Sequence, residues 1–163
     1  MILVVADTSP LNYLVQIEAI GILPRLFDQV VIPETVLQEL LHPATPEIVR
    51  RWAMRLPEWA VSRAAHSIVP IDLDRGETEA IALARELNAF AVLLDDGSAR
   101  AKARALGISV TGTIGLLERA ALADLLNLPE AIERLRLTNY YASSELLQAA
   151  LERDAERRRL KND

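Results

Sequence analysis

Short, uninterrupted apolar runs separated by helical segments constrain this fold more than any other feature of the sequence. The run at residues 2–6 ends in Asp7, and a second run at residues 91–94 ends in Asp95 and Asp96. Runs this short and apolar are typical of strands in a parallel sheet with both faces covered. An acid directly after such a strand lies at the carboxyl edge of the sheet, where α/β proteins build their sites.

Strand-like and helix-like segments alternate along the rest of the chain. Strands are predicted at residues 2–6, 29–32, 60–63, 91–94 and 108–110. Helices are predicted from about residue 9, around 36–41, from about 45, at 75–87 and 98–106, from 111–113 through 121, and at 130–137 and 143–158. This alternation predicts an α/β fold in which helices cover both faces of a parallel sheet.

The length and composition limit the class of protein. A chain of 163 residues is about one domain long, so we predict a single domain over 1–163 with a C-terminal helical extension from about residue 129. The absence of cysteine excludes disulfides, thiolate metal sites and thiol nucleophiles. The first apolar run is too short for a signal peptide or membrane span, so we expect a cytoplasmic protein with no membrane partner. The net charge of −5 argues against a general nucleic-acid coating protein but is compatible with a nuclease.

Carboxylates occur at four places where strand and helix ends are expected to converge. Hard divalent cations take oxygen ligands and are often held by a few carboxylates plus water. Carboxylates left unpaired in one pocket raise one another's pKa, so such a cluster indicates a cation site. The chemistry most in keeping with it is phosphodiester hydrolysis by a metal-activated water. The candidates are Asp7, Glu39, Glu77 with Glu79, and Asp95 with Asp96.

Each acid also has a structural explanation. Asp7 fits a helix N-cap, and Asp95-Asp96 before a glycine fits a turn. If the strand continues through them, Asp95 and Asp96 point in opposite directions and one of them enters the pocket. On helical periodicity alone, Glu39 is a surface carboxylate.

Two acids in the helix at residues 75–87 cannot share a face because they are two positions apart. Helical periodicity places Glu77 near the apolar stripe of Ile81 and Ala84, whereas Glu79 is turned well away from it. Glu77 is therefore the preferred site residue of this helix, and Glu79 is a supporting candidate. Acids in the first turn of a helix are also common for reasons of the helix dipole alone.

Taken together, these segments resemble a PIN domain, the nuclease fold of VapC-type toxins from prokaryotic toxin–antitoxin pairs. The resemblance covers residues 1 to about 115, in the family's order and approximate spacing. It is closest to a poorly characterised prokaryotic subgroup with D-T-S-P and G-E-x-E-A motifs. The matching segments are VVADTSPL around Asp7, VIPETVLQEL around Glu39, GETEAIALARELN around Glu77, and AVLLDD at Asp95-Asp96.

The resemblance implies a three-layer α/β/α sandwich and a ribonuclease that depends on Mg²⁺ or Mn²⁺. It also implies a cognate antitoxin protein and a homodimer. Carried over by position, the metal ligands are Asp7, Glu39, Glu77 and Asp95, with Asp96 beside the last of them. Here the third acid is Glu where the family usually has Asp.

Hydroxyl and basic side chains complete the predicted site. Thr8 or Ser9 is expected to orient Asp7 or a metal-bound water, and Thr113 to add a polar contact. A basic helix flanks the pocket and is expected to hold the RNA backbone. Its basic residues are Arg100, Lys102 and Arg104.

Other classes of function are less consistent with these residues. The main alternative is a non-enzymatic interaction module, a PIN-like domain with an attenuated metal site. A phosphatase with Asp7 as nucleophile is disfavoured because its motif needs a second aspartate where Ser9 stands. Histidine-based catalysis is poorly supported because His42 and His66 have no nucleophile pattern beside them.

Overall fold

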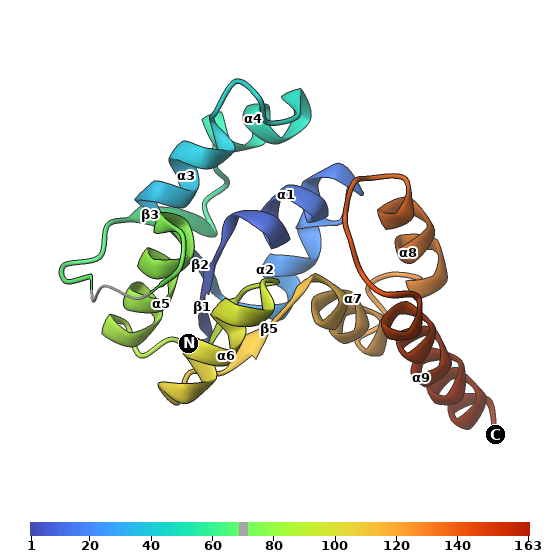
Figure 1. The fold of residues 1–163 in the computed structure, drawn as a ribbon. Helices are drawn as coiled ribbons and strands as arrows, with labels where there is room; N and C mark the ends of the chain where they lie inside the picture. The colour runs from blue at the N-terminus through green and yellow to red at the C-terminus, as the bar shows by residue number, and fades with distance from the viewer. Residues whose placement is uncertain (69–71) are drawn as a thin grey trace. The chain divides into compact units, whose positions relative to one another are not determined.

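The computed structural model describes residues 1–68 and 72–163 (Figure 1). The chain forms two compact units, Met1–Thr113 and Ile114–Asp163. The first unit contains the sheet and every predicted site residue.

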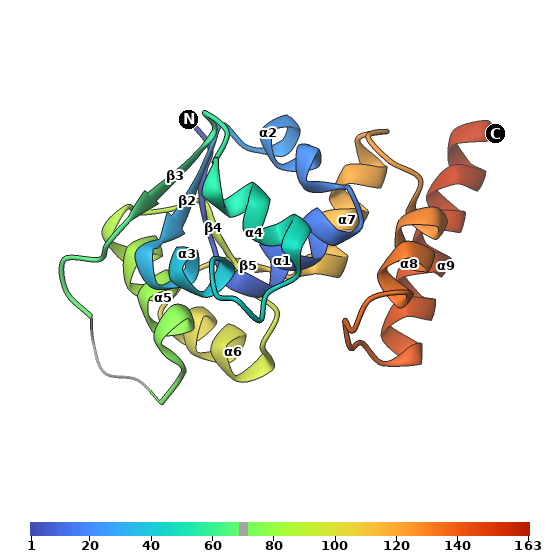
Figure 2. The ribbon, with the colours of Figure 1, turned by 90° about the horizontal axis from the view of Figure 1, so that it is seen from above.

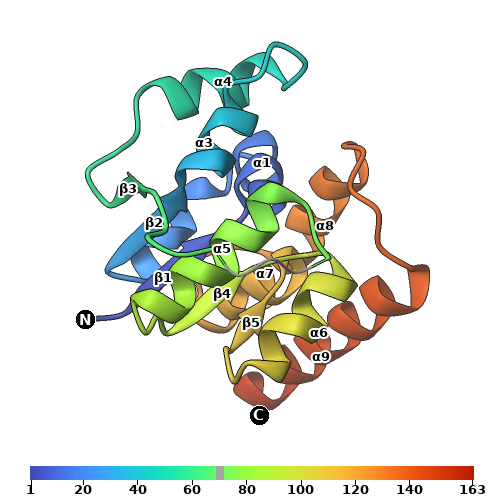
Figure 3. The same cartoon turned by 60° about the vertical axis from the view of Figure 1, so that its left-hand side comes forward.

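A five-stranded sheet is the centre of the first unit. Every pair of neighbouring strands is parallel, and the order across the sheet is β3-β2-β1-β4-β5, which can be followed in Figure 3. The strands are β1 (Leu3–Ala6), β2 (Gln29–Pro33), β3 (Ala60–Arg63), β4 (Ala91–Leu93) and β5 (Val110–Thr111). The three inner strands β2, β1 and β4 are almost completely buried, as their continuous apolar runs predict.

Helices cover both faces of this sheet, which confirms the predicted three-layer α/β/α class. On one face, Val5 and Val92 of the sheet pack against Ala84 of α5 and Ala103 of α6. Figure 2 shows α1 and α2 on the opposite face. The helices of this unit are α1 (Thr8–Gln16), the 3₁₀ turn η1 (Ile20–Ile22), α2 (Leu23–Leu26), α3 (Glu34–Leu40), α4 (Glu47–Met54), α5 (Arg75–Glu86) and α6 (Gly97–Ala105).

The strand order creates a topological switch point at β1. From β1 the chain moves outward through β2 and β3, and it then returns to the other side of β1 with β4 and β5. In open α/β sheets, ligands bind at such a switch point outside the carboxyl ends of the strands, which here are the ends of β1 and β4. The backbone N–H of Asp7 donates to the carbonyl of Leu93 (3.0 Å), which fixes Asp7 beside the end of β4. Asp95 follows that strand by two residues.

The helix ends are set by side chains that the sequence supplies locally. Asp74 caps α5 by accepting from the N–H of Glu77 (2.8 Å), and Asp96 caps α6 by accepting from the N–H of Ala99 (2.9 Å). Gly107 has a φ of 78° and ends α6, because a left-handed residue after a helix satisfies its last carbonyls.

The end of α6 also determines where the last strand begins. The sequence predicted a strand at residues 108–110, whereas β5 is Val110–Thr111. The N–H of Ile108 donates to the carbonyl of Ala103 (3.0 Å), so Ile108 still belongs to the end of α6. The prediction also missed η1 and α2, which follow Glu18.

The second unit is helical. Leu128, Ile132 and Leu135 form the buried face of one of its helices. Arg153 pairs with Glu118 (2.5 Å), which connects the last helix to the first. The elements are α7 (Thr113–Leu122, beginning at the last residue of the first unit), α8 (Leu128–Arg136) and α9 (Ser144–Asn162). Over the described residues of both units, no helix is long and apolar enough to cross a membrane.

Candidate functional site

Asp7 is the most buried of the predicted metal ligands, with 6% of its surface exposed. It occupies the N-cap position of α1, yet its side chain makes no capping hydrogen bond. The pKa of this carboxyl is raised from its ordinary value of 3.8 to about 7. Burial is the main cause, the backbone N–H of Thr8 opposes it, and the charges of Asp74, Glu77 and Glu39 add to it. The local fold therefore keeps a carboxylate where it is costly to ionise, without using it as a cap.

Glu39 reaches the same region from the exposed side of α3. The hydroxyl of Thr8 donates to Glu39 Oε2, which joins the start of α1 to α3. A Cβ atom added to Gly76 would lie only 2.8 Å from Glu39 Oε1. The bare glycine at the start of α5 therefore lets this carboxylate lie against the helix that carries Glu77.

Glu77 is half-buried in the first turn of α5. Burial, followed by the charges of Asp74 and Asp96, raises the pKa of Glu77 from 4.5 to about 7. Asp74 thus acts on both Asp7 and Glu77, although the sequence analysis did not select it. The signal that could have identified it is the Asp74-x-x-Glu77 spacing, which is typical of a helix N-terminus.

Asp95 is held by three hydrogen bonds. Its Oδ2 accepts from the hydroxyls of Ser9 (2.8 Å) and Thr113 (2.7 Å), and its Oδ1 accepts from the backbone N–H of Thr113 (2.7 Å). Asp96 instead turns to cap α6, so these neighbouring acids point to different partners. The hydroxyls of Thr8 and Ser9 thus donate to Glu39 and Asp95, and their expected role in orienting Asp7 or a metal-bound water stays a prediction.

The three basic residues predicted to bind RNA differ in their surroundings. A Cβ atom added to Gly112 would lie 2.8 Å from Arg100 Nη1 and 2.9 Å from Asp95 Oδ1, so the guanidinium lies close to this acid. Lys102 donates to the backbone carbonyl of Asp72 (3.0 Å), which connects α6 to the segment before α5. Arg104 is exposed. Of the three, Arg100 is the one that these contacts place beside the acids.

Glu79 is buried, although helical periodicity turned it away from the stripe of Ile81 and Ala84. Only 4% of its surface is exposed. Its carboxylate accepts from the N–H (2.9 Å) and hydroxyl (3.0 Å) of Thr35 and from the N–H of Ala65 (3.3 Å). The reason is that α5 is buried on two sides, against the sheet and against α3. These contacts give Glu79 a structural role in joining α5 to α3.

The two histidines lie in separate local contacts. Nδ1 of His42 accepts from the N–H of Ala44 (3.0 Å). The His66 ring lies 3.3 Å from Glu86, an exposed residue at the end of α5. The described contacts of both rings are thus with groups outside the predicted acid site.

The carboxylates around Asp7, at the end of β1, are the candidate ligands for a metal ion. In the part of the chain that the structure describes, no three acidic or histidine side chains converge closely enough to form a ready-made metal cage. Mg²⁺ needs no such cage, because it keeps several waters and binds through one or two carboxylates. The groups that shift the pKa of Asp7 include three carboxylates and, among the described residues, no basic side chain. Uncompensated oxygen donors of this kind fit a hard divalent cation.

Comparison with known proteins identifies the family. A family model described as a PIN domain matches residues 3–156, so the chain belongs to the PIN-domain family. Among solved structures, the chain is similar to a PilT N-terminus domain protein from the hyperthermophilic archaeon Sulfolobus solfataricus P2. The identity is 16% and the TM-score 0.48, with 87% of this chain and 100% of that chain covered. No curated protein matches the sequence. The PIN fold is a nuclease-type fold whose members generally use divalent metal ions and bind nucleic acids.

Proposed function

We propose that this protein is a metal-dependent endoribonuclease whose catalytic centre is built around Asp7. The observation that carries the proposal is the combination of burial and repulsion at this carboxyl. Asp7 is buried and does not cap its helix. Burial and the charges of Asp74, Glu77 and Glu39 raise its pKa to about 7. A fold that retains such a destabilising charge at a topological switch point is best explained by a ligand that neutralises it.

The proposed metal ligands are Asp7, Glu39 and Glu77, and the proposed ion is Mg²⁺ or Mn²⁺. Such an ion supplies Lewis-acid polarisation of a phosphoryl oxygen and a lowered pKa of the attacking water. Asp95 is held by Ser9 and Thr113 at the end of the neighbouring strand. With three donors already bound to its oxygens, Asp95 has fewer acceptor sites left for a direct ligand than Asp7 has, and it acts mainly by fixing the geometry of the crevice.

The wider biological role is proposed from the resemblance to VapC-type toxins. We propose that this chain is the toxin of a toxin–antitoxin pair, that a cognate antitoxin blocks its acid site, and that it works as a homodimer. Expression of the wild-type chain is then expected to arrest growth of a host cell, whereas Asp7→Asn at equal expression is not. Equal toxicity of the two chains would refute a toxin that acts through this site.

The biochemical test is cleavage of a pool of structured and unstructured RNAs with Mg²⁺ or Mn²⁺ and with chelator. We expect cleavage only with metal, its loss in Asp7→Asn, and products with a hydroxyl on the upstream fragment and a phosphate on the downstream one. Products ending in a cyclic phosphate would show attack by the ribose hydroxyl and would contradict a metal-activated water. Absence of both cleavage and metal binding would favour the interaction module.

A further inference from the structure

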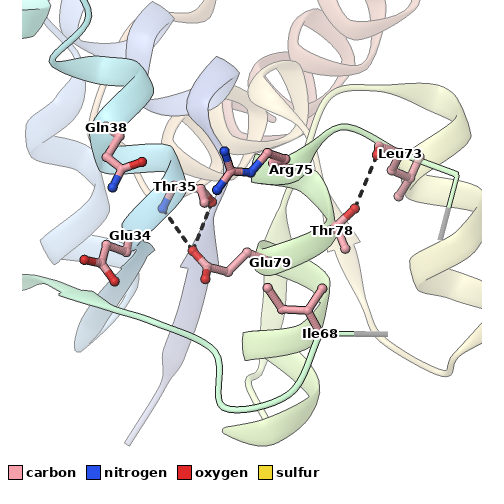
Figure 4. Close-up of a pocket in the computed structure, with 8 residues that line it drawn as sticks. All are labelled: Glu34, Thr35, Gln38, Ile68, Leu73, Arg75, Thr78 and Glu79. Carbon is pink, nitrogen blue, oxygen red and sulfur yellow. Dashed lines mark hydrogen bonds between the residues drawn. The ribbon is translucent and has the colours of Figure 1, made fainter. Parts of the chain in front are cut away.

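A polar pocket lies between α3 and α5, outside the acid site described above. It has a volume of about 430 Å³, within the range of pockets that bind small ligands. Figure 4 shows side chains from both helices lining it, together with Ile68 and Leu73. The polar lining residues are Glu34, Thr35 and Gln38 from α3, and Arg75, Thr78 and Glu79 from α5.

This pocket adjoins the acid site through both helices. Gln38 immediately precedes Glu39 on α3, and Arg75 immediately precedes Gly76 on α5. The Glu39 carboxylate lies against Gly76, where an added Cβ would come within 2.8 Å, so the two helices that line the pocket also meet at one of the acids. A polymer bound across the acid site could therefore place a neighbouring unit in the pocket.

Hydrogen bonds fix the inner wall of the pocket and stabilise the Glu79 carboxylate in it. Glu79 accepts three hydrogen bonds from Thr35 and Ala65, two of which are drawn in Figure 4. The hydroxyl of Thr78 donates to the carbonyl of Asp74 (2.7 Å). The two bonds from Thr35 to Glu79 join α3 to α5, and the bond within the start of α5 fixes Thr78, so the wall is formed before any ligand binds.

The outer part of the pocket presents polar groups that the described fold does not use. Arg75 is exposed and makes no ion pair or hydrogen bond with the residues described. The amide of Gln38 is likewise exposed and without a hydrogen-bond partner among them. A guanidinium binds phosphate through paired donors, and a carboxamide offers both a donor and an acceptor to the edge of a base.

We propose that this pocket binds the nucleotide next to the scissile phosphate, with Arg75 contacting the RNA backbone and Gln38 the edge of the base. The inference rests on the proposed ribonuclease function and assigns part of its substrate specificity. An acid cluster repels a polyanion, and a cation beside the cluster reduces that repulsion. Arg75 supplies a cation of this kind one residue before Gly76.

The test compares Arg75→Ala and Gln38→Ala with Arg85→Ala, a matched change at an exposed arginine near the other end of α5. The substrates are fluorescent single-stranded RNAs that differ in the nucleotides flanking the mapped cleavage site. We expect Arg75→Ala to raise KM about tenfold and to lower the salt dependence of RNA binding by about one ion. We expect Gln38→Ala to flatten the preference among bases at one flanking position, and Arg85→Ala to resemble wild type.

RNA binding measured by fluorescence anisotropy in chelator separates this inference from the proposed function. If wild type cleaves RNA and all three variants share its KM, affinity and base preference, the pocket assignment is overturned and the ribonuclease stands. If neither wild type nor any variant cleaves, the ribonuclease fails, and RNA binding alone tests whether the pocket holds a nucleotide. Weaker RNA binding by Arg75→Ala than by Arg85→Ala then supports the pocket. Equal binding by the two variants, or no binding at all, overturns it.

Discussion

Replacing Asp7 with asparagine is expected to stabilise the metal-free protein at alkaline pH, although it removes the central site residue. Asp7 is buried, and the pKa of its carboxyl is raised from 3.8 to about 7. Between these two values the folded protein holds a proton that the unfolded chain has released. The free energy of unfolding is therefore fully retained below about pH 4 and falls as pH rises towards about 7. Asparagine carries no charge, so it removes this cost.

The magnitude follows from the pKa difference. A shift from 3.8 to about 7 corresponds to roughly 4 kcal/mol of stability lost when Asp7 ionises in the fold. This figure is a ceiling, because Glu77 is coupled to Asp7 and has a raised pKa of about 7 as well. We expect Asp7→Asn to raise the free energy of unfolding by about 2 kcal/mol near pH 8 and by less than about 1 kcal/mol near pH 5.

Urea unfolding of wild type and Asp7→Asn in chelator, at both pH values, measures these differences directly. Saturating Mn²⁺ should then stabilise wild type near pH 8 and leave Asp7→Asn almost unchanged, because the ion binds only the folded wild-type site. An Asp7→Asn variant that is less stable than wild type near pH 8 would refute the reasoning. It would mean that the carboxylate contributes favourable contacts within the fold.

Three further predictions concern the neighbouring groups. Glu79→Gln should lower the free energy of unfolding by about 1–3 kcal/mol in urea without changing Mn²⁺ affinity, because its carboxylate accepts three hydrogen bonds within the fold; unchanged stability would contradict this. Metal affinity measured by calorimetry should rise between about pH 6 and pH 8, since Asp7 and Glu77 must release protons held with a pKa of about 7; a flat profile would contradict the raised pKa values. Thr113→Val should slow cleavage and cost about 1–2 kcal/mol of stability by removing a hydroxyl from Asp95, and Thr113→Ser should restore both; an equal loss in both variants would assign the effect to packing.

The sequence was most informative where structure depends on short segments. The continuous apolar runs predicted β1 and β4, and β3 coincides with the predicted residues 60–63. Because parallel strands end at one edge, the positions of Asp7 and Asp95 near neighbouring strand ends also followed from local pattern. Local pattern failed at β5, where the helix-ending bond from Ile108 displaces the start of the strand.

Contacts between distant segments could not be predicted in this way. Helical periodicity identified a single buried face of α5, the one that carries Ile81 and Ala84. The helix has a second buried face, which carries Glu79, because α3 packs beside it. The partners Thr35 and Ala65 come from elements whose separation is set only by the tertiary fold. The influence of Asp74 on Asp7 has the same origin, since it depends on how α5 meets the end of β1.

The most direct test of a metal-dependent ribonuclease centred on Asp7 is the rate of cleavage of one RNA with and without Mn²⁺, for wild type, Asp7→Asn and Glu79→Gln. Both variants replace a buried carboxyl group by its amide, but only Asp7 lies among the proposed ligands. We predict metal-dependent cleavage by wild type and by Glu79→Gln where it is folded, and none by Asp7→Asn. Cleavage by Asp7→Asn at the wild-type rate, or cleavage that survives chelator, would contradict the assignment.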